Sequence, residues 1–140
     1  MNRQDWQQIA EEKLLAADAL LAASQWSAAY YLAGYAVECG LKSCILNRVA
    51  SNPGVIFEKK TFSQNCWTHD LATLVDLAGL MPVLDAATAS AAALKANWGT
   101  VCQWSEETRY QRKMQAEATA LWDAIIDPND GVMQWIRARW

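Results

Sequence analysis

The chain has 140 residues, 53% of them hydrophobic and 19% charged, which is enough for one compact domain and too apolar for a disordered chain. Its formal net charge of −3 excludes a broadly basic nucleic-acid-binding surface, although it is compatible with a local basic patch. No secretory signal and no stretch of ~18 uninterrupted apolar residues is found, so we expect a single cytoplasmic domain over residues 1–140 with reduced cysteines and no membrane contact.

Only three prolines and six glycines interrupt the chain, which favours helix nearly throughout. Apolar residues at helical spacing predict a first helix over residues 5–23, with Asp5 as its cap. A second, long helix is predicted over 25–50, with Ser24 as its cap candidate. Irregular sequence is expected from there to Thr68.

The second half of the chain is expected to add shorter elements. In chain order these are a helix over 69–79 capped by Thr68, a helix over 82–97, an irregular connection over 98–110, a helix over 111–126 and an amphipathic tail over 132–140. Together the elements predict an all-α, up-and-down bundle of four to five helices with a short C-terminal amphipathic helix.

The long second helix carries two organised stripes. One begins at Trp26 and has the small and apolar residues of a core face. The other contains Tyr31, Tyr35, Glu38 and Lys42, and its last two residues stand in the favourable order for an (i, i+4) ion pair. This second stripe is a candidate binding surface, and a solvated ion pair is the alternative interpretation.

Several kinds of binding and catalytic site are not expected, because the residues that they require are absent. No glycine-rich phosphate loop is present, and the chain has one histidine. Cys66 and His69 form C-x-x-H, but the remaining thiols that could complete a zinc site, Cys39 and Cys44, do not face one another on a helix. We therefore expect no metal site and no cofactor.

Four segments, in this order and at these distances, resemble the HEPN (higher eukaryote and prokaryote nucleotide-binding) domain family. They are AYYLAGYAVECGLKSCI at 29–45, THDL at 68–71, WSEETRY at 104–110 and GVMQWI at 131–136. The resemblance spans nearly the whole chain and implies a helical bundle, commonly a homodimer, with a nucleotide- or RNA-related role. Many members are ribonucleases of toxin–antitoxin or phage-defence systems, and a small nucleotidyltransferase is often encoded beside them, so such a protein is a possible partner.

Ribonucleases of this family carry an arginine followed four to six residues later by a histidine. In this chain no histidine follows Arg109, and none lies within reach of Arg48. The usual catalytic motif is therefore absent, and we expect no standard ribonuclease. His69 and Arg109 are the only candidates for a base and a phosphate-stabilising cation in a non-standard arrangement.

The resemblance carries over a binding surface. Lys42 and Arg109 would hold phosphate, and tyrosine or tryptophan rings would stack on a base. The expected nucleotide- or RNA-binding residues are Tyr31, Tyr35, Glu38, Lys42, Asp70, Trp104, Arg109 and Tyr110.

An alternative function of another class is a dimerisation or partner-binding bundle without a ligand. In that case the aromatic stripe of the second helix would be buried in an interface. Trp135, Ile136 and Trp140 on the tail would add apolar contact area to it.

Overall fold

The computed structural model describes residues 1–140, and every regular element in it is helical. The eight α-helices are α1 Arg3–Ala22, α2 Trp26–Ser51, α3 Phe62–Asn65, α4 Leu71–Leu77, α5 Met81–Ser90, α6 Ala92–Val101, α7 Gln115–Ile126 and α8 Val132–Arg137. Two short 3-10 helices, η1 Pro53–Phe57 and η2 Glu106–Tyr110, complete the set. The predicted all-α class is confirmed.

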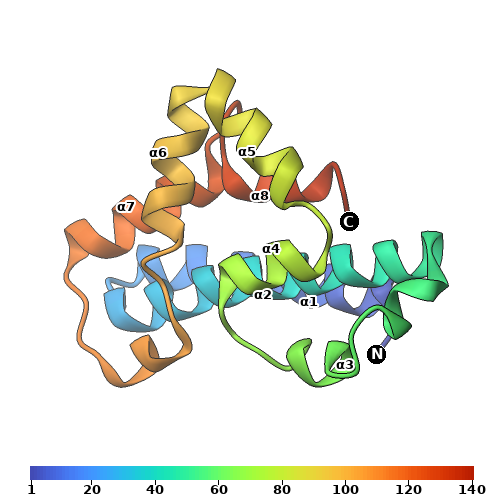
Figure 1. The fold of residues 1–140 in the computed structure, drawn as a ribbon. Helices are drawn as coiled ribbons and strands as arrows, with labels where there is room; N and C mark the ends of the chain where they lie inside the picture. Colours follow the sequence, from blue (N-terminus) through green and yellow to red (C-terminus); the bar gives the residue numbers. More distant parts are fainter.

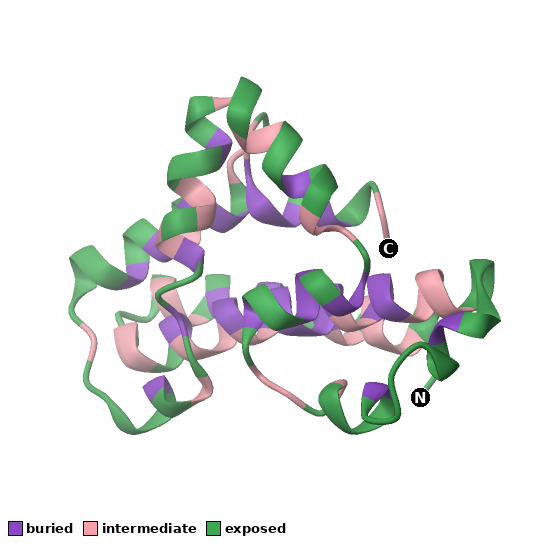
Figure 2. Cartoon of the chain, viewed as in Figure 1, coloured by how far each residue is buried: buried purple, intermediate pink, exposed green.

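Helix α2 is the element on which most others pack. It forms a hairpin with α1 through a short turn, in which Ser24 adopts a left-handed conformation with φ 58° rather than capping α2. Helices α4, α7 and α8 and both 3-10 helices also contact α2 (Figure 1). The most buried ribbon segments accordingly lie along α2 (Figure 2).

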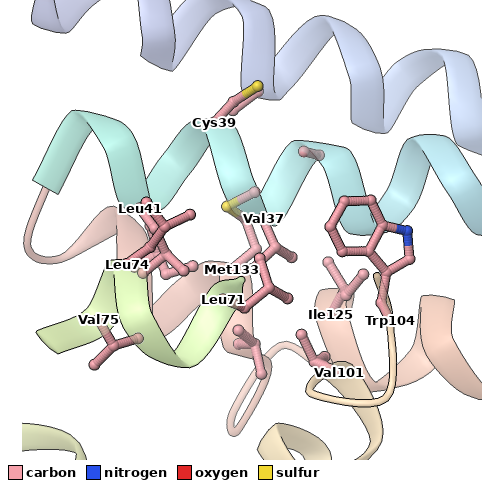
Figure 3. Packing of buried hydrophobic residues seen from close by; sticks show 14 of the residues in the cluster. Val37, Cys39, Leu41, Leu71, Leu74, Val75, Val101, Trp104, Ile125 and Met133 are labelled. Atoms are coloured by element: carbon pink, nitrogen blue, oxygen red, sulfur yellow. The ribbon is translucent and has the colours of Figure 1, made fainter. Parts of the chain in front are cut away.

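Small residues let neighbouring elements approach α2 closely. A Cβ atom at Gly34 would lie 2.2 Å from Cδ1 of Trp104, so the indole packs directly on the α2 backbone (Figure 3). A Cβ at Gly40 would lie 2.9 Å from Cγ2 of Ile136 in α8. Glycine at these two positions therefore fixes how closely the loop before η2 and helix α8 can pack.

The predicted helix over 82–97 is wrong, because two helices cover this stretch. Ala91 has extended backbone angles, φ −126° and ψ 95°, and separates α5 from α6. The break lets α6 fold back against α5, and α6 joins this hairpin to α7 and α8 rather than to α2. Most of its residues are exposed (Figure 2).

Two predicted helix caps are also wrong. Asn2 caps α1: its side chain accepts a hydrogen bond from the Asp5 backbone N–H at 3.0 Å, and the Asp5 carboxylate accepts one from Asn2 at 2.7 Å. Asp70 caps α4, while the Thr68 hydroxyl accepts a hydrogen bond from the Asp70 backbone N–H at 3.1 Å. In both cases the side-chain oxygen of a nearby residue accepts a hydrogen bond from a backbone N–H in the first turn of the helix.

Other helix boundaries differ from the predicted ones. The stretch expected to be irregular up to residue 68 contains η1 and α3, which bury Val55 and Phe62. The helix expected from residue 111 begins at Gln115, where the Glu117 carboxylate accepts a hydrogen bond from the Met114 backbone N–H at 3.1 Å. Extra, shorter helices thus replace part of the expected connections.

The C-terminal tail belongs to the core of the same chain. Trp135 is 8% exposed and Ile136 is fully buried, so these side chains are not free to cover a partner, contrary to the alternative interpretation above. The Nε1 atom of Trp135 is buried without a hydrogen-bond partner. Packing of α8 against α2 and α7 explains the burial.

No single helix combines the length and apolar character required to cross a membrane. One bent pair, α4 with α5, reaches the threshold only when the two helices are taken together, and the angle between them is 114°.

Two buried thiols make the stability of this core sensitive to alkaline pH. Cys39 and Cys44 are at most 2% exposed, and burial raises the pKa of each thiol to about 12. Above about pH 9 the unfolded chain loses thiol protons that the native state keeps, so the free energy of unfolding should fall by up to ~1.4 kcal/mol per pH unit per thiol. We expect melting temperature to fall more steeply between about pH 9 and 10.5 in the wild type than in a Cys39→Ala/Cys44→Ala variant; equal slopes would contradict this.

Candidate functional site

A fully buried carboxylate lies at the centre of the site. Glu38, in the middle of α2, has no exposed side-chain surface. Its Oε1 atom is 2.8 Å from Nζ of Lys42, and His69 Nδ1 lies 2.9 and 3.0 Å from its two oxygens. The interpretation of Glu38 and Lys42 as a solvated pair is therefore wrong. A buried carboxylate is tolerated only with such partners, since desolvation of an unpaired charge is costly.

The histidine extends this cluster toward the surface. His69 Nε2 lies 3.1 Å from Oε2 of Glu106, and the other oxygen of Glu106 lies 3.2 Å from Nη1 of Arg109. The groups form one chain from α2, through the segment before α4, to η2. We call it the charge network; its members are Lys42, Glu38, His69, Glu106 and Arg109.

The charge network is more exposed at its Arg109 end than at its Lys42 end. The side chain of Lys42 is 12% exposed, that of Glu106 31%, that of His69 42% and that of Arg109 44%. Tyr110, next to Arg109, is 79% exposed, and the guanidinium carbon lies 4.9 Å from the centre of its ring. A ligand from solvent can therefore reach the η2 end of the network directly.

Sequence reasoning identified four members of the network but missed Glu106. The structure brings together His69 and Arg109, which are far apart in the sequence, because both contact the Glu106 carboxylate. The sequence holds one signal for Glu106. It stands three residues before Arg109, and this spacing places both side chains on one side of a helical turn.

The tyrosines of the predicted stripe lie beside the network. The rings of Tyr31 and Tyr35 are stacked, with centroids 6.1 Å apart and planes 4° from parallel. Trp104 packs at 6.1 Å from Tyr31 and is only 3% exposed, so its expected role in stacking on a base does not agree with its position. Burial raises the pKa of Tyr35 to about 12.

Two further predicted ligand contacts are already engaged within the protein. Lys42 donates to Glu38 and lies 5.1 Å from the ring centre of Trp6, at the buried end of the network. The Asp70 carboxylate accepts the Thr73 backbone N–H at 2.7 Å as the α4 cap. Of the eight residues expected to bind ligand, Asp70, Arg109 and Tyr110 are exposed, and Asp70 is already used as the α4 cap.

The arrangement shows no group of three or more His, Cys, Asp or Glu side chains placed to hold a metal ion. His69 directs its ring nitrogens to the two carboxylates, and Cys39 and Cys44 are buried in α2 away from it.

Comparison of the chain with protein-family models, with curated proteins and with solved structures finds no match.

Proposed function

We propose that the chain binds a phosphate-bearing ligand, a nucleotide or RNA, at the exposed end of the charge network. The observation that supports this is the convergence of His69 Nε2 and Arg109 Nη1 on one carboxylate, that of Glu106. An imidazolium ring has a donor at each nitrogen, so both groups can donate to an anion when His69 is charged. A phosphate group presents oxygens to paired donors in a similar way, and arginine suits such contacts. The HEPN resemblance of the sequence points to the same ligand class.

In this conformation the Glu106 carboxylate stands where the phosphate would bind. Glu106 lies on a short 3-10 helix with its side chain 31% exposed, so rotation of that side chain frees both donors. Phosphate therefore competes with an anion that belongs to the protein. Removal of the charge of Glu106 should favour the ligand.

Tyr110 supplies the contact for a base. Its ring is 79% exposed and lies beside the Arg109 guanidinium. Exposed aromatic rings next to a cation are used to stack bases of single-stranded nucleic acids, with a contribution of about 1–3 kcal/mol per base. The pair of residues would thus hold a phosphate and an adjacent base together.

The experiment measures binding of ATP, pyrophosphate and a short single-stranded RNA by calorimetry. Arg109→Gln should weaken binding of all three about tenfold, because a hydrogen bond to a charged group contributes roughly 1.5 kcal/mol or more. Tyr110→Ala should weaken ATP and RNA but not pyrophosphate. Glu106→Gln should tighten binding several-fold.

Matched controls lie on the same exposed segment. Glu107→Gln and Arg112→Gln remove the same charges from exposed side chains outside the network, and should leave affinity within about twofold. Equal losses of affinity in Arg109→Gln and Arg112→Gln would mean that the effect comes from the overall charge of the protein and not from the site. Absence of binding in both the wild type and Glu106→Gln would refute the proposal.

The same geometry favours RNA cleavage as a second candidate function. Glu38 lies 2.9 Å from His69 Nδ1, and in the neutral ring with its proton on Nδ1 the other nitrogen, Nε2, is unprotonated and can act as a base. Arg109 would stabilise charge on the phosphorus centre. RNA recovered intact from the binding experiment excludes this activity, whereas cleavage that is lost in His69→Ala supports it.

A further inference from the structure

The Lys42 end of the charge network, opposite Arg109, lies at a pocket. A pocket of about 360 Å³ opens where α1, α2, η1 and α3 meet. Of the ten residues that line it eight are hydrophobic, and three of its walls are the aromatic rings of Trp6, Phe62 and Trp67. Trp67 is 79% exposed and forms the rim, so the pocket is open to solvent on that side.

Lys42 is the one charged residue that lines this pocket. Its side chain is 12% exposed and donates one hydrogen bond, to Glu38. An ammonium group has three donors, so two of them have no acceptor in the protein. A nearly buried cation with unused donors, next to aromatic walls, favours an anion over a neutral molecule.

The charges around the pocket also favour an anion. No acidic side chain lines it. The acid in the adjoining segment, Glu58, is paired with Arg48 at 3.1 Å, whereas Lys59 and Lys60 next to it are exposed and make no ion pair. The nearest carboxylate to Lys42, that of Glu38, does not line the pocket and is shared with His69, so Lys42 presents the one charge on the pocket wall.

We infer that this pocket binds a small, flat aromatic anion, with its ring among Trp6, Phe62 and Trp67 and its carboxylate or comparable group on Lys42 Nζ. The aromatic walls favour a planar ring over an aliphatic chain, since stacked and edge-to-face contacts add to apolar burial. A pocket of this volume lies within the size range of small-molecule sites. The inference does not rest on the proposed function, because that ligand binds at the other end of the network.

The test uses the full chain and three probe compounds in calorimetry. Indole-3-acetate should bind saturably and at least tenfold more tightly than its neutral analogue indole-3-acetamide. Octanoate, which has the charge without the ring, should bind more weakly than indole-3-acetate. No saturable binding of indole-3-acetate, equal affinity for acid and amide, or tighter binding of octanoate would overturn the inference.

Lys42→Met should abolish the preference for the acid over the amide, while the control Lys60→Met, on an exposed lysine that does not line the pocket, should retain it. A preference that persists in Lys42→Met would exclude the Lys42 contact.

Because Lys42→Met also removes a partner of Glu38, a second measurement uses the wild type. Cys66 lines the pocket. Cys102, the residue that follows α6, is exposed and does not line the pocket. Burial raises the pKa of both thiols, so both are alkylated with iodoacetamide at alkaline pH and followed by mass spectrometry. Indole-3-acetate should slow the reaction of Cys66 several-fold and leave Cys102 unchanged. Equal rates at Cys66 with and without the compound would place any binding outside this pocket.

Discussion

Replacement of Gly34 by alanine is expected to lower the free energy of unfolding by about 2 kcal/mol. The added Cβ would lie 2.2 Å from Cδ1 of Trp104, well inside contact distance, and the indole is only 3% exposed and has no room to retreat. Overpacking of this kind costs about 1–3 kcal/mol or more, which outweighs the gain of about 1 kcal/mol from replacing a helical glycine. Urea denaturation followed by circular dichroism measures the change.

Gly99→Ala is the matched control. Gly99 also lies inside a helix, α6, but a Cβ there would meet no atom within 4 Å. The same substitution should therefore raise the free energy of unfolding by up to about 1 kcal/mol, so the two variants should differ in sign. A stabilised Gly34→Ala variant would mean that Trp104 is not packed on α2 in solution. Because η2 begins two residues after Trp104, Gly34→Ala should also weaken binding at Arg109.

The second large effect is expected from Glu38→Gln, which should lower the free energy of unfolding by about 3 kcal/mol. The amide keeps the size of the side chain but leaves the Lys42 ammonium, which is 12% exposed, without its counter-ion. It also removes the charged partner of His69 Nδ1 at 2.9 Å. Loss of one member of a buried ion pair is far more costly than the pair is worth in stability, because the other charge remains desolvated. Urea denaturation at neutral pH measures the loss.

Glu11→Gln makes the same chemical change in an exposed pair. The Glu11 carboxylate accepts two hydrogen bonds from Arg137, at 2.6 and 2.7 Å, but both side chains are more than 40% exposed. Its loss should cost less than about 1 kcal/mol, as for most surface pairs. If both substitutions have the same small effect, Glu38 is hydrated in solution and the charge network is not a buried one.

The parts of the fold that local sequence determines were predictable. The first two helices were expected over 5–23 and 25–50, within two residues of α1 and α2 at each end, because their apolar periodicity and the turn between them are local signals. The break at Ala91 was not predictable, since the residues around it are good helix formers. It follows from the contact of α5 with α6, which depends on the folded chain.

The candidate site, too, is predictable from the sequence only in part. His69, Arg109 and Tyr110 stand out in the sequence as chemically capable residues, but whether they lie together depends on η2 returning to α2. The pairing of Gly34 with Trp104 permits that close approach, and neither residue alone indicates it. The sequence alone therefore predicts ligand stacking for Trp104, which is buried, and does not indicate Glu106, whose role exists only in the folded site.

The α5–α6 hairpin has a consequence for how this chain can tolerate change in length. Its turn around Ala91 joins two largely exposed helices, and the hairpin is anchored through α7 and α8 rather than through α2. Exposed turns of this kind accept insertions because few buried contacts are disturbed. An inserted segment or fused domain at this turn would extend outward from the bundle, so the turn offers an attachment point for labels that leaves both ends of the charge network unobstructed (Figure 1).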